Sequence, residues 1–285
     1  MAALSPPSDK VTFWYGCNVV RHGDIIYNAI ALLEAVGMEV TPAGGAGYCC
    51  GTKKDANLTA AQGMGRRNVE KFNAHNTGQV VSWCPSCYRH MNAFISQYTE
   101  PQFDFSHFIE ILYERRDWLA TKLIHPVTKR VLLHQHLGFH EVDINPMVIA
   151  LLRLIPGLEL MTTSPLAPAH MCSELSRVPA SLKVVNQQTC ESMRRSGADT
   201  LATVFHSCQR LLCGLEASES FTVVNYVNLL AQSMGLVSVD EYKDWKLAGT
   251  AQAVIDRLGP DRVAKMGEPF FHASILPELL SPPIK

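Results

Sequence analysis

Five of the nine cysteines lie in the first third of the chain, with the spacing C-x31-CC-x33-CxxC. They are Cys17, Cys49, Cys50, Cys84 and Cys87. Thiolates bind soft metal ions, and five of them exceed both the four ligands of a structural zinc site and the four of an ordinary cubane iron–sulfur cluster. The C-x2-C-x2-C run of a bacterial ferredoxin is absent. We interpret the five as one thiolate cluster assembled from three loops.

The adjacent pair Cys49–Cys50 requires a turn, because neighbouring side chains on a regular strand face opposite ways. The Gly-Gly-Ala-Gly run at 44–47 and Gly51 provide the backbone freedom for such a turn. The alternative is that the cysteines are small apolar core residues. Scattered core cysteines would not all follow predicted strands, so we favour the thiolate cluster.

The apolar pattern predicts short strands that alternate with helices. The strands are expected at 11–15, 38–41 and 79–82, and the helices at 24–36, 58–74, 87–97 and 106–115. A loose arm is expected at 1–10. This alternation predicts an α/β fold with a mostly parallel sheet flanked by helices. Ligands of such sheets bind at the carboxyl ends of the strands, which is where the cysteine loops fall.

The same order of elements returns in the second half, which predicts an internal duplication with a period near 120 residues. Strands are expected at 130–133, 158–161 and 200–204, and helices at 145–154, up to 195, at 223–234 and at 240–258. The matched positions are Cys17 with Gln135, Cys50 with Cys172, Cys84 with Phe205, and Cys87 with Cys208. We therefore divide the chain into a first cysteine-rich repeat (1–125), a second repeat (126–236) and a C-terminal extension (237–285).

The cysteine pattern resembles the cysteine-rich CCG domain found in the B-type subunits of heterodisulfide reductases. Glycolate oxidase iron–sulfur subunits, lactate-utilisation proteins and one class of succinate dehydrogenase subunit are relatives in the same family. All five motif positions match. The resemblance implies that the five cysteines bind a non-cubane [4Fe-4S] cluster and serve as the catalytic, cofactor-binding and metal-binding residues of an oxidoreductase subunit.

The resemblance further implies electron transfer in sulfur metabolism, between that cluster and a disulfide, persulfide or carrier-bound sulfur substrate. No GxGxxG motif follows a predicted strand, so the electrons must come from or go to another chain. The implied partners are a ferredoxin-like iron–sulfur subunit and a flavoprotein subunit of the same complex. The altered second repeat looks more like the B-type subunits of bacterial sulfur-oxidising heterodisulfide-reductase-like complexes than the two-cluster form of methanogens.

The second repeat departs from the family pattern at three of the five cysteine positions. The Cys-His-Leu-Gly that opens this repeat in the family is Gln135-His136-Leu137-Gly138 here. The cysteine pair is Met171-Cys172 followed by Ser173, and the CxxC is Phe205-x-x-Cys208. With two of five thiols left, we expect no second five-thiolate cluster.

Three hypotheses for this second site stay open at the level of sequence. Cys172 and Cys208 with His136, His170 or His206 are a ligand set for tetrahedral zinc. The same residues would suit a substrate cleft in which His136 or His206 donates a proton to a leaving thiolate. The site is otherwise a decayed repeat kept for packing.

Other histidines and cysteines of the second repeat bear on the same question. The run His134, His136 and His140 is more typical of a polar loop than of a metal site. Cys190 and Cys213 fall in helical stretches and are predicted core residues.

Two alternative functions follow from the same residues. In the first, the protein is a non-catalytic electron-relay or anchoring subunit whose second site is structural, with zinc as a candidate. In the second, it is a thioredoxin-like dithiol oxidoreductase that uses Cys84 and Cys87, because Trp83-Cys84-Pro85-Ser86-Cys87 follows a strand and opens a helix. That hypothesis leaves Cys17, Cys49 and Cys50 unexplained.

Composition excludes several classes of protein. A formal net charge of −1 over 285 residues gives no electrostatic basis for binding nucleic acid or an anionic membrane. Nine cysteines without a secretory signal pattern predict the reducing cytoplasm. No uncharged apolar run approaches the ~20 residues of a membrane-spanning helix. Any association with the inner membrane would be peripheral and through partners.

Overall fold

The computed structural model describes residues 9–51, 57–97 and 99–284. Most of the arm expected at 1–10 lies outside the described residues, and residues 9 and 10 belong to the first strand. The chain forms two compact units. Unit 1 comprises residues 1–128, 138–158 and 226–238, and unit 2 comprises residues 129–137, 159–225 and 239–285.

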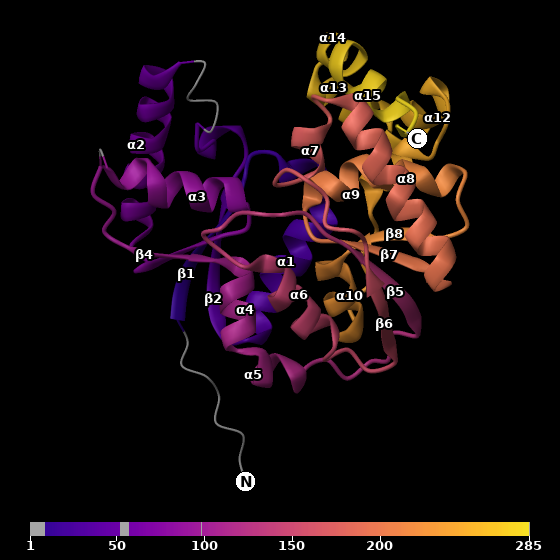
Figure 1. Ribbon diagram of the computed structural model, residues 1–285. Coiled ribbons are helices and arrows are strands. Elements are labelled where there is room, and N and C mark those ends of the chain that lie inside the picture. The colour runs from indigo at the N-terminus through magenta and orange to yellow at the C-terminus, as the bar shows by residue number, and fades with distance from the viewer. Residues whose placement is uncertain (1–8, 52–56, 98, 285) are drawn as a thin grey trace. The chain divides into compact units, whose positions relative to one another are not determined.

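Unit 1 contains a four-stranded sheet in the order β2-β1-β3-β4, with all paired strands parallel (Figure 1). The strands are β1 (Asp9–Gly16), β2 (Met38–Gly44), β3 (Gln79–Ser82) and β4 (Asp104–His107). The helices of this half are α1 (Gly23–Ala35), α2 (Leu58–His75), α3 (Pro85–Ala93), α4 (Phe108–Glu114) and α5 (Arg116–Ala120). The strands are rich in β-branched and aromatic residues, which favour a buried parallel sheet.

The second sheet repeats this topology in the order β6-β5-β7-β8. Its strands are β5 (Lys129–His134), β6 (Leu158–Thr163), β7 (Thr200–Thr203) and β8 (Thr222–Asn225). The helices of unit 2 are α7 (Cys172–Leu175), α8 (Pro179–Ser196), α9 (His206–Leu212), α11 (Glu241–Lys246), α12 (Ala251–Leu258), α13 (Pro260–Met266), α14 (Glu268–Phe270) and α15 (Leu276–Leu280). Identical strand order in both sheets confirms the predicted α/β fold with two repeats.

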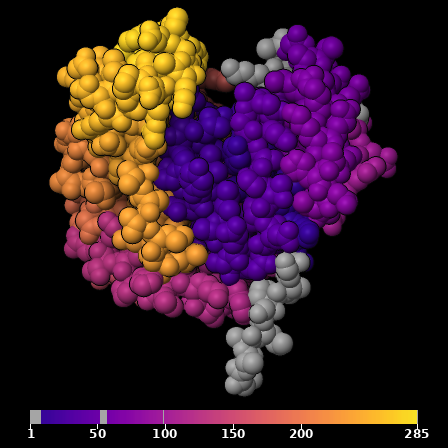
Figure 2. Space-filling model, turned by 180° about the vertical axis from the view of Figure 1, so that it is seen from behind, coloured from indigo at the N-terminus to yellow at the C-terminus, as the bar shows by residue number. Residues whose placement is uncertain are grey.

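Two helices of the second repeat belong to unit 1. α6 (Ile144–Leu152) packs on α4, and α10 (Tyr226–Ser233) packs on α1, although about 200 residues of chain separate the latter pair. Figure 2 shows the orange residues of the α10 segment against the indigo residues of α1. Polar side chains fix this contact, since the buried Asn28 donates to the half-buried Asn228 at 2.8 Å and Asn228 donates to the buried Asp24 at 2.6 Å. The compact units therefore do not coincide with the sequence repeats.

Both repeats contain a strand where the sequence pattern predicted only a helix. The helix predicted at 106–115 begins as β4 and continues as α4, and the helix predicted at 223–234 begins as β8 and continues as α10. In each case the strand passes into the helix without a Gly or Pro between them, so the apolar spacing alone did not reveal the change. His107 marks the first transition as the N-cap of α4, where its side chain accepts a hydrogen bond from Ile109 N–H.

Two other element boundaries differ from the prediction. The single helix expected at 240–258 is two helices, α11 and α12, because Gly249 takes a positive φ of 79° and Thr250 caps α12. The helix expected to begin at Cys87 begins at Pro85, which is suited to the first turn because its fixed φ is helical and no hydrogen bond to its nitrogen is lost. Cys87 therefore lies inside the first turn of α3.

The buried His107 predicts a pH-dependent stability. Burial lowers the pKa of His107 to about 3, and its Nδ1 must stay unprotonated to accept the bond from Ile109 N–H at 3.3 Å. Below the ordinary histidine pKa of about 6.5, the unfolded chain binds a proton that the folded chain does not, so stability falls as the pH falls from about 6.5 toward 3. We expect this residue to contribute a slope of about 1.4 kcal/mol per pH unit.

Urea unfolding of wild type and His107→Asn between pH 4.5 and 7.5 measures that contribution. Asparagine is a good N-cap that does not titrate, so the variant should lose stability less steeply in acid. The exposed His272→Asn is the matched control and should keep the wild-type slope. Equal slopes for wild type and His107→Asn would contradict the assignment.

Candidate functional site

The five cysteines of the first site come from the ends of three neighbouring strands. Cys17 follows β1, Cys49 and Cys50 follow the short 3-10 helix Ala46–Tyr48 after β2, and Cys84 and Cys87 follow β3. In the sheet, β1 lies between β2 and β3. Parallel strands end at the same edge of a sheet, so the three loops meet there.

The thiols of these loops contact one another. The Cys17 thiol is hydrogen-bonded to Cys49, and the Cys87 thiol is hydrogen-bonded to both Cys50 and Cys84. Cys17 also interacts electrostatically with Cys50 and Cys84. The three loops therefore bring the five thiols to the same sheet edge as two hydrogen-bonded groups, Cys17 with Cys49 and Cys87 with Cys50 and Cys84, that interact electrostatically.

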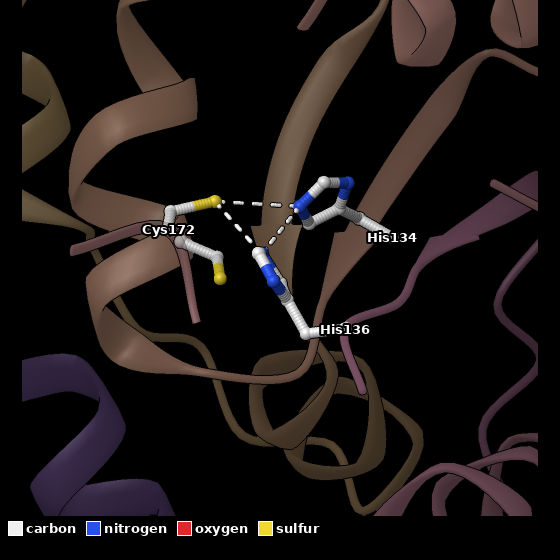
Figure 3. Close-up of side chains that lie close together, drawn as sticks. His134, His136 and Cys172 are labelled. Atoms are coloured by element: carbon white, nitrogen blue, oxygen red, sulfur yellow. Dashed lines mark hydrogen bonds between the residues drawn. The ribbon is translucent and has the colours of Figure 1, made fainter. Parts of the chain in front are cut away.

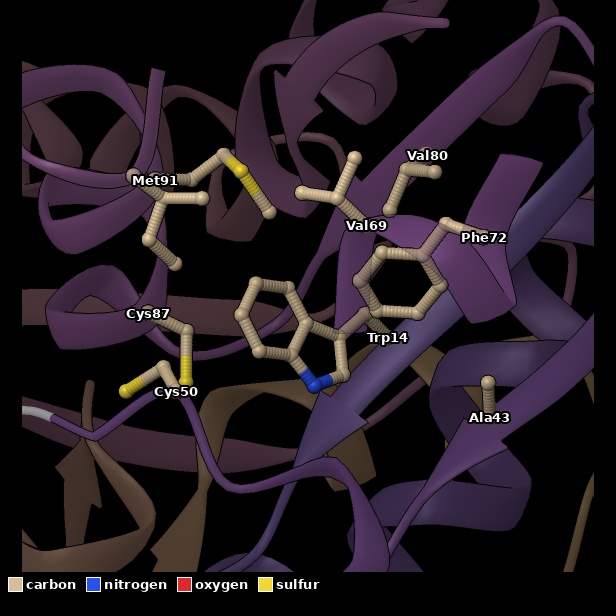
Figure 4. Packing of buried hydrophobic residues seen from close by; sticks show 9 residues of the cluster. Trp14, Ala43, Cys50, Val69, Phe72, Val80, Cys87 and Met91 are labelled. Atoms are coloured by element: carbon tan, nitrogen blue, oxygen red, sulfur yellow. The ribbon is translucent and has the colours of Figure 1, made fainter. Parts of the chain in front are cut away.

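The site has a dry side and a more accessible side. Cys50 and Cys87 are each 2% exposed and belong to the apolar core of unit 1. Figure 4 shows the indole of Trp14 next to Phe72 and facing these two cysteines, and the two rings lie 5.1 Å apart. Cys17, Cys49 and Cys84 are half-buried.

Electrostatics make the five thiols unequal. The Cys87 thiol, together with the backbone N–H groups of Cys87 and Ser86, lowers the pKa of Cys84 to about 7. The hydrogen bond with Cys49, burial, and the neighbouring thiols raise the pKa of Cys17. The hydrogen bonds with Cys50 and Cys84, and burial, raise that of Cys87. Five sulfurs this close cannot all be ionised without a cation among them, so the donor set fits a thiolate-bound metal cluster.

Two glycines keep space at this site. Gly16 has a φ of +81°, and a Cβ placed there would lie 3.5 Å from Cys87 Sγ and 3.4 Å from Cys84 Cβ. A side chain at this position would therefore fill the space beside those sulfurs. Gly51 has a φ of +77°, and its Cβ would lie 3.0 Å from both Cα and O of Ala61 in α2. Only glycine allows the Cys49–Cys50 loop to approach α2 so closely.

The second repeat brings four buried ligand atoms together in unit 2 (Figure 3). They belong to His134, His136, Cys172 and Cys208, and all lie within 4.8 Å of one another. His134 Nε2 lies 3.2 Å from His136 Nε2 and 3.4 Å from Cys172 Sγ, and His136 Nε2 lies 3.1 Å from Cys172 Sγ. Cys208 is hydrogen-bonded to Cys172 and to both histidines.

This arrangement favours one thiolate. Although burial opposes ionisation, the hydrogen bond from Cys172 and the two histidines hold the pKa of Cys208 well below its usual value. Burial, with the adjacent Cys208, raises the pKa of Cys172. Two imidazoles, a thiolate and a thiol in one buried group are a donor set for a borderline-soft divalent cation.

The structure places the predicted second-site residues in two classes. His136, Cys172 and Cys208 come together, whereas His170 and His206 are not members of this group of four. His140 is exposed and pairs with Glu141 at 3.3 Å. As predicted from their helical positions, Cys190 and Cys213 are buried, in α8 and at the end of α9.

His134 is the member of this group that the sequence argument set aside. The available signal was the His-x-His spacing, because residues two apart along an extended chain face the same side. His134 is the last residue of β5, and the chain stays extended enough for His136 to bridge to Ala167. The His-x-His spacing therefore indicated that the two imidazoles lie together, which the polar-loop interpretation did not include.

Residues 11–92 match the family model of the CCG cysteine-rich domain. This segment of unit 1 is similar to a CCG domain. The match runs from β1 into α3 and includes all five cysteines of the first site. The CCG domain and the Cys/His group of unit 2 indicate an iron–sulfur or metal-binding redox role.

Comparison beyond the CCG domain adds little. No curated protein matches the chain. A Nocardia farcinica maleate cis-trans isomerase mutant with a covalently bound succinylcysteine intermediate is 13% identical, with 81% of this chain and 94% of that chain covered and a TM-score of 0.32. The ligand-free complex of the TorS sensor domain with TorT is 11% identical, with 93% and 87% covered and a TM-score of 0.30. Likenesses this weak support no inference about function.

Among the described residues, none of the helices combines the length and the apolar character needed to cross a bilayer.

The close approach of Gly51 to α2 predicts a site-specific effect of a single methyl group. In the metal-free protein, Gly51→Ala should cost at least about 2 kcal/mol of stability, because backbone strain and a clash with Ala61 add together. It should also speed the labelling of Cys50 by a maleimide under native conditions, because the loop moves off α2.

Gly78→Ala is the matched control. Gly78 also has a positive φ of 72°, but nothing lies within 4 Å of its added Cβ. Gly78→Ala should lower the free energy of unfolding by about 1 kcal/mol through backbone strain alone and leave the labelling of Cys50 unchanged. If both variants behaved alike in unfolding and labelling, the packing role of Gly51 would be wrong.

Proposed function

We propose that this protein is the iron–sulfur redox subunit of a heterodisulfide-reductase-like complex in the cytoplasm. In this proposal Cys17, Cys49, Cys50, Cys84 and Cys87 hold a non-cubane [4Fe-4S] cluster. The observation that supports it most is that five thiols lie at one sheet edge as two hydrogen-bonded groups that interact electrostatically, within a segment that matches the CCG domain.

The chemistry would be divided between cofactor and protein. When bound, the cluster supplies the electrons that cleave or form a sulfur–sulfur bond in a disulfide, persulfide or carrier-bound sulfur substrate. The protein holds the sulfurs: Cys50 and Cys87 are fixed in the apolar core beside Trp14, which keeps water from that side. The half-buried Cys17, Cys49 and Cys84 define the side from which a substrate would approach.

The chain also stabilises negative charge at one sulfur. The N–H groups of Ser86 and Cys87, in the first turn of α3, point their hydrogen bonds at Cys84. Such bonds, with the positive end of the helix, favour the more negative state of the site. A short-range electrostatic bias of this kind helps to set a reduction potential.

The proposed partners are redox subunits, because the sequence contains no dinucleotide-binding motif. Because no GxGxxG motif follows a strand, we propose that electrons pass to or from a ferredoxin-like iron–sulfur subunit and, beyond it, a flavoprotein subunit. In the non-catalytic alternative the same site would exchange electrons with those neighbours only and would not turn over a disulfide.

The thioredoxin-like alternative explains fewer of the observations. A dithiol pair requires only Cys84 and Cys87, yet Cys87 also bonds to Cys50, and Cys17 bonds to Cys49. A function that uses only two thiols does not account for these further hydrogen bonds.

Metal analysis of protein prepared without oxygen tests the proposal. Wild type should contain about four iron and about four acid-labile sulfide per chain and should give an electron paramagnetic resonance signal in one redox state. Cys50→Ser should lose most of both and change the signal, because it removes a buried ligand. Cys190→Ser removes a thiol that is 5% exposed, in α8 and outside both ligand groups, and should keep wild-type iron. Full iron and an unchanged signal in Cys50→Ser would refute the ligand assignment.

A further inference from the structure

The ligand group of unit 2 is sealed inside the protein. His134, His136, Cys172 and Cys208 are each at most 1% exposed. They come from three separate segments, since His134 ends β5 and His136 follows it, while Cys172 begins α7 and Cys208 lies in the first turn of α9. Buried polar groups are costly unless they are paired or bind a cation. Four ligand atoms converging from three segments point to a bound ion.

The distances fit one tetrahedral ion. Zinc binds histidine nitrogen at 2.0–2.1 Å and thiolate sulfur at 2.3 Å, so the edges of a Cys2His2 tetrahedron are about 3.3 Å for N–N and about 3.6 Å for N–S. The N–N distance between His134 and His136 is 3.2 Å. The N–S distances from Cys172 are 3.1 Å to His136 and 3.4 Å to His134. An ion at the centre requires small outward shifts of these side chains.

The outer faces of both rings are already fixed. His136 Nδ1 lies 3.3 Å from the carbonyl of Pro168, which only accepts hydrogen bonds, so Nδ1 carries a proton and Nε2 is directed at Cys172. His134 Nδ1 lies 3.3 Å from the hydroxyl of the buried Thr189. Ligand histidines in metal sites are oriented by outer partners of this kind.

The geometry excludes the iron–sulfur alternatives for these four residues. A two-iron centre with two histidines and two cysteines places the nitrogen pair and the sulfur pair on different irons, which is incompatible with N–S contacts of 3.1 and 3.4 Å. A five-thiolate cluster has lost three of its ligands. The sheet register also places His134 opposite Thr203 as it places Trp14 opposite Ser82, so an imidazole replaces an indole at the matching position.

We propose that His134, His136, Cys172 and Cys208 form a closed mononuclear zinc site that is structural and redox-inert. All four tetrahedral positions are filled by the protein, and the residues are buried, so no position is left for a substrate or a catalytic water. The ion ties the end of β5 to the starts of α7 and α9. The duplicated fold would then carry one redox centre and one structural zinc, and the second site would neither accept nor donate electrons.

The outer residue Thr189 gives the sharpest test, because its removal should leave the fold intact. Full-length protein, prepared without oxygen, should contain about one zinc per chain. Thr189→Val, of nearly the same shape, should lower zinc affinity about 10- to 100-fold in competition with a chromophoric chelator. The exposed His272→Asn changes a histidine outside the group and should leave the affinity unchanged.

Cobalt substitution reports the ligands directly. Co²⁺ taken up by zinc-depleted protein should give the visible absorption of a tetrahedral site and a thiolate charge-transfer band, and Cys172→Ser should remove much of the latter. Wild type that holds no zinc and takes up no Co²⁺ would overturn the proposal and leave a hydrogen-bonded polar core. Iron bound in Cys50→Ser and lost in Cys50→Ser/Cys172→Ser would also overturn it. Neither outcome bears on the first site, whose own test is the iron content of Cys50→Ser against wild type.

Discussion

Sulfur atoms held in contact inside a protein cannot all carry charge unless a cation lies among them. This constraint applies to both ligand groups of the chain. In unit 1 the pKa of Cys84 is lowered to about 7, whereas the pKa values of Cys17 and Cys87 are raised. In unit 2 the pKa of Cys208 is lowered and that of Cys172 is raised. The sheets, helix starts and glycines around each group are the means of holding sulfurs where their mutual repulsion would otherwise separate them.

The two repeats place different sets of ligand side chains on one scaffold. Both sheets have the same strand order, and the retained cysteines Cys87 and Cys208 each occupy the third residue of the helix that follows the third strand. What differs is the space next to them. The first repeat has Gly16 beside Cys84 and Cys87, where an added Cβ would lie 3.5 Å from the Cys87 sulfur. The second has two imidazoles next to its two cysteine sulfurs.

The sequence was sufficient to predict the parts of this picture that depend on local spacing. Alternating strands and helices indicated the parallel sheets, and the C-x31-CC-x33-CxxC spacing indicated that Cys17, Cys50 and Cys87 meet at strand ends. The lost cysteines of the second repeat were visible in the same way. These inferences succeed because a parallel sheet brings all strand ends to one edge whatever the details of packing.

Features that depend on the three-dimensional arrangement were beyond the reach of sequence patterns. β4 and β8 each continue directly into a helix, so their apolar residues were counted as part of the helical pattern that follows. The packing of α10 on α1 depends on Asn28, Asn228 and Asp24, whose partners lie far along the chain. His134 belongs to the ligand group because β5 ends with that side chain turned inward, which spacing suggests but does not establish.

The central claim is that one scaffold holds two different metals in its two halves. Crystals of protein prepared without oxygen, measured on both sides of the iron and zinc absorption edges, test this most directly. The account predicts an iron anomalous peak among Cys17, Cys49, Cys50, Cys84 and Cys87, and a zinc peak among His134, His136, Cys172 and Cys208. Iron at both places, or no metal among the five cysteines, would contradict it.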